Sequence, residues 1–121
     1  MRQRLQWTER VLELSTEAIN WQVLRVVDER GRERELALRD LAVEVFERFD
    51  GPSEEGPDTV YDTENRLHHK HLPRLDEFDL LAYDRDSETV SAGSNFDKGL
   101  QVVNHTMKMV VELSPEPTTD Q

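Results

Sequence analysis

The segment from Arg66 to Arg74 has the composition of an anion-binding surface. It reads Arg-Leu-His-His-Lys-His-Leu-Pro-Arg, with three fixed positive charges, three histidines and no carboxylate in nine residues. We refer to Arg66–Arg74 as the cationic segment. Guanidinium, ammonium and imidazole N–H groups bind phosphate oxygens, and Arg and Lys also bind the major-groove edge of guanine. The cationic segment therefore predicts binding of a polyanion, and its chemistry fits nucleic acid.

Six side chains in and near the cationic segment are candidates for contact with double-stranded DNA. They are Asn65, Arg66, His69, Lys70, Arg74 and Arg85. The fixed cations would meet phosphates or guanine, and Asn65 would pair with adenine. The opposing interpretation is a solvated helix face whose arginines pair with acidic neighbours such as Asp62 or Glu64.

The histidines of the cationic segment raise two further hypotheses. His71 falls on the apolar side of the expected helix, so we expect it to be structural and to hydrogen-bond a backbone carbonyl. A zinc or nickel site needs three or four converging ligands. His68 and His71 lie three residues apart, with His105 as a further candidate, but acidic residues are so frequent that apparent clusters arise by chance. We therefore predict no metal site and no cofactor.

The chain lacks the sequence motifs of common catalytic sites. It has no cysteine, no Gly-rich phosphate loop, no nucleophile elbow and no His-Glu-x-x-His motif. Nothing in the sequence brings a serine and a histidine together. We therefore expect a binding protein rather than an enzyme.

The whole chain is strongly acidic. Asp and Glu number 26 against 15 Lys and Arg, which gives a net charge of −11, and only three of the basic residues are lysines. This composition is expected of a protein that works in molar salt, where the Debye length falls to about 3 Å and carboxylates hold water and cations. The Asp and Glu residues would then serve to keep the whole surface hydrated and the protein soluble. The net charge therefore does not exclude nucleic acid as a partner.

Length and hydropathy limit the class of protein. The 121 residues suffice for one domain with an added terminal helix. The composition is 36% hydrophobic and 34% charged, and no apolar run approaches the roughly 20 residues of a spanning helix. The first residues also lack the apolar run of a signal peptide. We therefore expect a cytoplasmic protein without a membrane partner.

Hydrophobic periodicity predicts the elements that position the candidate residues. Helices are expected over residues 1–14, 16–30, 38–49, 59–76 and 95–113. Leu36 suits a strand of one or two residues, and alternation predicts a β-hairpin with strands at 81–83 and 88–91. A loop rich in Pro and Gly is expected over 50–57. Pro73 removes a backbone donor inside a helical pattern, which predicts a kink or break near His69 to Pro73.

The last predicted helix carries an apolar stripe with coiled-coil spacing. Its members are Phe96, Leu100, Val103, Met107 and Val110, spaced 4, 3, 4 and 3 residues apart. This spacing is typical of a helix that packs along another helix. We expect a homodimer through this stripe, with Trp7, Val11 and Leu14 as neighbours, although the stripe could instead cover the chain's own core. The expected division is a domain over 1–94, a dimerisation helix over 95–113 and a disordered tail over 114–121.

The order helix, helix, short strand, helix, helix, hairpin resembles that of a winged helix-turn-helix domain. The residues from His71 to Tyr83 are similar to the end of the recognition helix and the first wing strand of ArsR/MarR-type regulators, whose pattern is H-L-x-x-L-x-x-x-G-L-[VI]. The residues in register are His71, Leu72, Leu75 and Leu80. Asp79 stands at the glycine position and still tolerates a left-handed conformation.

A closer resemblance is to a haloarchaeal winged-helix family of unassigned function. Its members carry H-x-H-L-P-x-L followed by a Y-D wing and a T-V strand. The matching positions are His69, His71, Leu72, Pro73, Leu75, Tyr83, Asp84, Thr89 and Val90. The resemblance covers about residues 15–91. It implies the winged-helix fold, and it implies DNA binding by analogy of fold.

The sequence thus predicts a mainly α protein with a small β-hairpin wing, a winged helix-turn-helix with a C-terminal dimerisation helix. The predicted function is that of a sequence-specific transcriptional regulator of a halophilic archaeon. It would bind double-stranded DNA as a homodimer through the helix containing residues 59–76. The alternative is a winged-helix protein-interaction module that does not bind DNA. A positive face over the cationic segment would favour DNA, and carboxylates covering that face would favour the interaction module.

Overall fold

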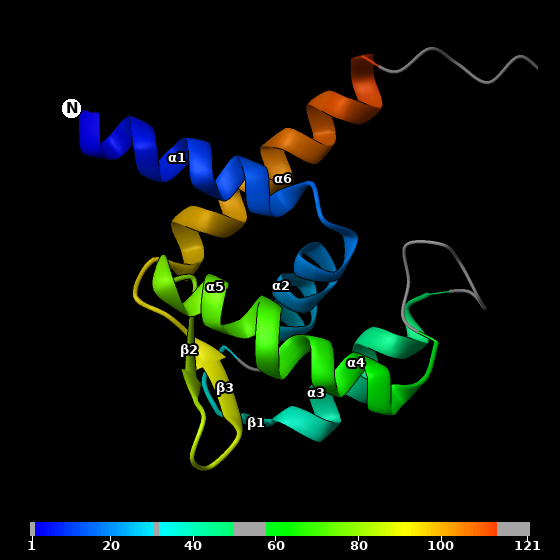
Figure 1. Ribbon diagram of the computed structural model, residues 1–121. Coiled ribbons are helices and arrows are strands. Elements are labelled where there is room, and N and C mark those ends of the chain that lie inside the picture. The colour runs from blue at the N-terminus through cyan, green and yellow to red at the C-terminus, as the bar shows by residue number, and fades with distance from the viewer. Residues whose placement is uncertain (1, 31, 50–57, 114–121) are drawn as a thin grey trace, which may run out of the picture.

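The computed structural model describes residues 2–30, 32–49 and 58–113 (Figure 1). The elements in chain order are α1 (Arg2–Ser15), α2 (Ala18–Arg30), β1 (Leu36–Ala37), α3 (Leu38–Glu47), α4 (Val60–Arg66), the π-helical turn η1 (Leu67–His71), α5 (Leu72–Glu77), β2 (Leu81–Asp84), β3 (Thr89–Ala92) and α6 (Phe96–Leu113). The expectation of a mainly α protein with a small hairpin is confirmed. The predicted loop over 50–57 and the predicted tail over 114–121 lie outside the described residues.

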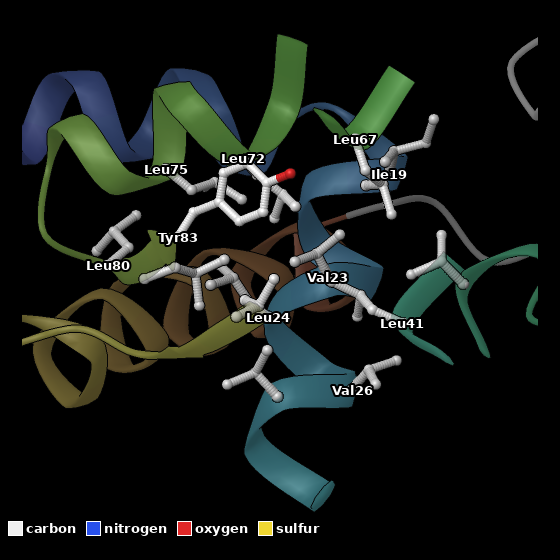
Figure 2. Close-up of a cluster of buried hydrophobic side chains, with 14 of the residues drawn as sticks. Ile19, Val23, Leu24, Val26, Leu41, Leu67, Leu72, Leu75, Leu80 and Tyr83 are labelled. Atoms are coloured by element: carbon white, nitrogen blue, oxygen red, sulfur yellow. The ribbon is translucent and has the colours of Figure 1, made fainter. Parts of the chain in front are cut away.

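Helix α2 is the centre of the hydrophobic core. Six of its thirteen residues are buried, and their spacing follows the helical period: Ile19, Asn20, Val23, Leu24, Val26 and Val27. Figure 2 shows Val23 and Leu24 pointing into the same cluster as Leu72 and Leu75 of α5. Since full burial of one such side chain stabilises a protein by about 1.5–3 kcal/mol, this cluster holds α2 and α5 together.

The three strands form an antiparallel sheet in the order β1-β3-β2. Leu36 of β1 pairs with Val90 of β3, and Leu81 of β2 pairs with Ala92 of β3. Val90, Leu81 and Tyr83 are buried, so one face of the hairpin covers the core. The predicted hairpin and the predicted short strand at Leu36 are both confirmed.

The helices α4, η1 and α5 follow one another without an intervening loop. Within η1 the chain makes a π-helical turn, which the backbone N–H of Leu72 closes by bonding the carbonyl of Leu67, five residues back. Pro73 explains this turn, because proline lacks the N–H for a regular helical bond and its ring would clash with the carbonyl four residues earlier. The predicted break near His69 to Pro73 is therefore a widened turn directly before Pro73.

Helix α6 packs on the chain's own core with its first half. Phe96, Leu100 and Val103 are only 3%, 8% and 1% exposed, and α1 crosses α6 in direct contact (Figure 1). At these three positions the predicted dimerisation stripe belongs to the core of the single chain, because α1 and the hairpin end already cover it. Met107 is partly buried, and the side chain of Val110 lies outside the described residues.

The expected neighbours of the stripe lie on α1. Val11 and Leu14 are buried in the core, and Trp7 is partly buried against it. The indole N–H of Trp7 donates to the carbonyl of Phe78 at 3.2 Å, which ties α1 to the end of α5. In residues 2–30, 32–49 and 58–113, no helix has the length and apolar character needed to cross a membrane.

The backbone of Asp79 and Leu81 lies so close to Gly93 that adding a single methyl group there should destabilise the fold. A Cβ atom at Gly93 would lie 2.3 Å from the carbonyl oxygen of Asp79 and 2.9 Å from the backbone nitrogen of Leu81. Because both are backbone atoms that cannot rotate away, Gly93→Ala should lower the free energy of unfolding by about 1–3 kcal/mol. Urea denaturation measures the change.

The neighbouring substitution Ser94→Ala is the matched control, since Ser94 is exposed. It should leave the urea midpoint nearly unchanged. A Gly93→Ala protein with the midpoint of the Ser94→Ala protein would contradict the packing described.

Candidate nucleic-acid interface

The cationic segment extends from the last residue of α4 through η1 into α5, and it is two-sided. Leu67, His71 and Leu72 face the core, where all three are buried. The cationic side chains face outward: the exposed fractions are 42% for Arg66, 59% for Lys70 and 44% for Arg74. The predicted DNA-contact residues of this helical stretch therefore belong to its solvent side.

Each fixed cation of the cationic segment forms an ion pair within the chain. Arg66 Nε lies 3.1 Å from an Asp62 oxygen, one helical turn earlier. Lys70 Nζ and Arg74 Nη1 lie 3.5 and 3.2 Å from the two carboxylate oxygens of Glu17. Three cations thus share two carboxylates. Exposed ion pairs contribute at most about 1 kcal/mol, so these cations remain able to exchange partners.

The sequence anticipated only part of this pairing. Asp62 was an expected partner of the arginines, whereas Glu64 instead pairs with Arg39 of α3 at 3.2 Å. Glu17 was not identified, because it lies just before α2 and more than fifty residues from Lys70 and Arg74. Helical spacing within one segment gives no information about such a contact.

His71 is held by a buried hydrogen-bond network. Its Nδ1 lies 2.8 Å from Asn20 Oδ1, and Asn20 Nδ2 donates to the carbonyl of Leu14 at 2.9 Å and to a Glu17 oxygen at 3.3 Å. Burial lowers the pKa of His71 from 6.5 to about 4, so the imidazole is neutral and its Nδ1–H donates to Asn20. The structural role of His71 was expected, but its partner is a side-chain carbonyl of α2 rather than a backbone one.

His68 connects the cationic segment to the hairpin. Its Nδ1 and the hydroxyl of Tyr83 in β2 share a hydrogen bond of 2.5 Å, and the two rings meet edge to face. Burial raises the pKa of Tyr83, so the hydroxyl keeps its proton. His69 stacks edge-on against His68 and is exposed. The contact fixes the position of the helix relative to the hairpin.

The two remaining candidates for DNA contact, Asn65 and Arg85, lie on α4 and in the hairpin turn. Asn65 is partly buried on α4, and Arg85 is exposed in the turn between β2 and β3. Asp84 Oδ1 accepts the backbone N–H groups of Asp86 and Ser87, which fixes the turn that carries Arg85. Tyr61, which sequence reasoning did not select, is 70% exposed in the first turn of α4. Its exposure could not be derived from an apolar pattern that places aromatic residues inside.

Carboxylates also lie beside the hairpin, toward its turn. A shallow hollow between α5 and the hairpin includes Glu35, Asp76, Asp84 and Arg85 in its lining. Across the part of the chain that the structure describes, no group of three or more histidine and acidic side chains is placed to hold a metal ion. The exposed surface next to the cationic segment is therefore of mixed sign.

A comparison with protein families finds one match over this region. Residues 21–91 match the model of a family described as a domain of unknown function (DUF7344), which is more than half of the chain. The match includes α2 from Trp21 onward, the whole cationic segment and most of the hairpin, and it leaves out α1, Glu17, Asn20 and α6. No curated protein and no solved structure matches the chain.

The buried His71 predicts that acid destabilises the protein. Because burial lowers the pKa of His71 to about 4 in the folded state, against about 6.5 when unfolded, the stability it contributes is complete above pH 6.5 and is lost as pH falls toward 4. The loss by pH 4 should be about 3 kcal/mol. Urea unfolding at a series of pH values measures it.

Two variants test whether this loss of stability comes from His71. His71→Gln keeps an N–H donor for Asn20 and removes the titration, so its stability should fall less steeply between pH 7 and pH 4. His105→Gln changes an exposed histidine of α6 and should follow the wild-type curve. Equal slopes for all three proteins would rule out the proposed contribution of His71.

Proposed function

The chain belongs to the DUF7344 family, and we propose that it is a winged helix-turn-helix protein that binds double-stranded DNA. In this proposal the protein acts as a homodimeric transcriptional regulator in the cytoplasm of a halophilic archaeon. The observation that carries the proposal is the outward placement of three fixed cations on one helical stretch that contacts a projecting β-hairpin.

The arrangement of elements supports the winged-helix interpretation. Helix α3 packs against α4, and α5 contacts β2, so the cation-bearing stretch lies between a supporting helix and the hairpin. Figure 1 shows the hairpin projecting beside this stretch. The sheet order β1-β3-β2 attaches the hairpin to the short strand that precedes α3. A winged helix uses these parts as positioning helix, recognition helix and wing.

Each candidate side chain has a role in the proposed complex. The cations of the cationic segment bind phosphates on both sides of the groove, and Asn65 and His69 reach base edges. Arg85 at the hairpin tip contacts the neighbouring backbone. The flanking Asp84 and Asp86 weaken that contact, so the helix supplies most of the affinity.

The second candidate function is a protein-interaction module with the same fold. The ion pairs of all three cations with Asp62 and Glu17, together with the acidic hollow beside the hairpin, favour this alternative. It predicts that the chain has no measurable affinity for duplex DNA at any salt concentration.

Removing two cations tests the DNA interface. Arg66→Ala with Lys70→Ala should lower the affinity for duplex DNA at least about tenfold, because each lost phosphate contact removes a share of the electrostatic binding free energy. The thermal midpoint should change little, since both side chains are exposed. Fluorescence anisotropy of a labelled duplex, titrated from about 0.2 to about 2 M KCl, measures the affinity.

The matched control is Arg10→Ala with Arg34→Ala, which removes the same charge from exposed positions outside the cationic segment. It should retain wild-type affinity apart from a small effect of net charge. Equal losses in the two double variants would move the DNA site elsewhere. A wild-type protein without DNA affinity would favour the interaction module.

The homodimer is proposed through the second half of α6. Of the predicted stripe, Phe96, Leu100 and Val103 are covered within the chain, whereas Met107 is only partly buried. Val111, one helical turn after Met107 on the same side of α6, is 71% exposed. One recognition helix reads only a few base pairs, so a twofold partner supplies the length of contact that specific binding requires. A second copy of α6 would cover these apolar side chains.

Charged substitutions on α6 test the dimer. Met107→Asp with Val111→Asp should give monomers, because burying two carboxylates between apolar helices is costly. Gln101→Asp with Asn104→Asp adds the same charge at exposed polar positions of α6 and should leave the mass unchanged. Light scattering in about 2 M salt, where surface repulsion is screened, measures the mass. A wild-type mass of one chain would contradict the dimer and leave the DNA interface standing.

A further inference from the structure

The carboxylate of Glu17 occupies the position of a ligand between two cations of the cationic segment. Its Oε1 lies 3.5 Å from Lys70 Nζ, and its Oε2 lies 3.2 Å from Arg74 Nη1. The second oxygen also accepts a hydrogen bond from Asn20 Nδ2 at 3.3 Å. A carboxylate that bridges an ammonium and a guanidinium through its two oxygens presents the same charge and donor geometry as two oxygens of a phosphate.

We propose that Glu17 is an intramolecular substitute for a DNA phosphate, which occupies Lys70 and Arg74 when no DNA is bound and is displaced when a backbone phosphate binds them. The proposal rests on the DNA-binding function proposed above and assigns a regulation to the same surface. Glu17 lies at the junction of α1 and α2. The competing carboxylate therefore comes from a different part of the chain than the helical stretch that carries Lys70 and Arg74.

The side chain of Glu17 is held in position by its hydrogen bond to the buried side chain of Asn20. Asn20 is 1% exposed and bonds the carbonyl of Leu14 as well as the Glu17 carboxylate. This anchoring keeps the acid at the cations at a lower entropic cost than a free side chain would incur. Asp62, the partner of Arg66, differs because it lies on the same helix and moves with its cation.

Displacement of Glu17 changes the salt dependence of binding. When phosphates bind Lys70 and Arg74, DNA releases about 0.9 cation for each contact. The freed carboxylate is no longer neutralised by the two cations and attracts cations from solution. This attraction offsets part of the release, so the affinity falls less with KCl than two phosphate contacts alone would require. Such an interface keeps more of its affinity at high salt, because the ion pairs of Lys70 and Arg74 with Glu17 are replaced by ion pairs with phosphates.

The variant Glu17→Gln tests the proposal. Glutamine keeps an oxygen acceptor for Asn20 Nδ2 but carries no charge to compete with phosphate. At about 0.2 M KCl the variant should bind a random-sequence duplex about three- to tenfold more tightly than wild type, and its plot of log K against log [KCl] should be steeper by about one.

The matched control is Glu13→Gln, which changes the net charge equally but removes a carboxylate that pairs with Arg10. A second comparison introduces Glu17→Gln into a protein that carries Lys70→Ala and Arg74→Ala. Without those two cations, Glu17→Gln should have no more effect than Glu13→Gln. This cycle separates local competition for the cations from a change in folding or in net charge.

The outcomes distinguish the proposal from the function on which it rests. If wild type binds the duplex and Glu17→Gln has the affinity and salt slope of Glu13→Gln, the role of Glu17 is overturned and DNA binding stands. If neither wild type nor Glu17→Gln binds the duplex between about 0.2 and about 2 M KCl, both proposals fall. A tighter Glu17→Gln protein whose gain persists without Lys70 and Arg74 would also overturn the role of Glu17.

Discussion

The buried side chain of Asn20 determines how the cationic segment lies on the molecule. A buried amide is costly unless its donors and acceptor are bonded, and Asn20 meets this condition through three different parts of the chain. It donates to the end of α1 at Leu14 and to Glu17, and it accepts from His71 in η1. These bonds are satisfied together only when η1 packs across the start of α2. With His71 turned inward, the neighbouring Lys70 must point outward beside Glu17.

The π-helical turn sets which residues of the stretch share a face. A wider turn retards the helical rotation, so residues after it lie on a different side from where a regular helix would place them. The consecutive burial of His71 and Leu72, followed by Leu75, reflects this shift. Pro73 is the local cause, because it cannot supply the N–H that a regular turn requires.

Local patterns in the sequence were sufficient for the elements and insufficient for the contacts between them. The periodicity of α2, the alternation of the hairpin and Thr59 as the N-cap of α4, whose hydroxyl bonds the N–H of Asp62, all depend on neighbouring residues. The bond between Asn20 and His71 joins residues 51 positions apart, and no spacing rule indicates it. The stripe on α6 illustrates the same limit, because a heptad spacing describes an apolar face and not the chain that covers it.

The net charge of the chain and the ion pairs of the cationic segment respond differently to salt. The net charge of −11 repels a polyanion over distances that dilute buffer leaves unscreened, whereas molar salt reduces the screening length to about 3 Å. At that length the proposed competition of Glu17 and phosphate for Lys70 and Arg74 would still operate, because these are contact pairs. The family match begins after Glu17 and Asn20 and includes both cations. The charge of this surface is therefore set jointly by Lys70 and Arg74, which lie inside the family match, and by the junction of α1 and α2 that precedes it.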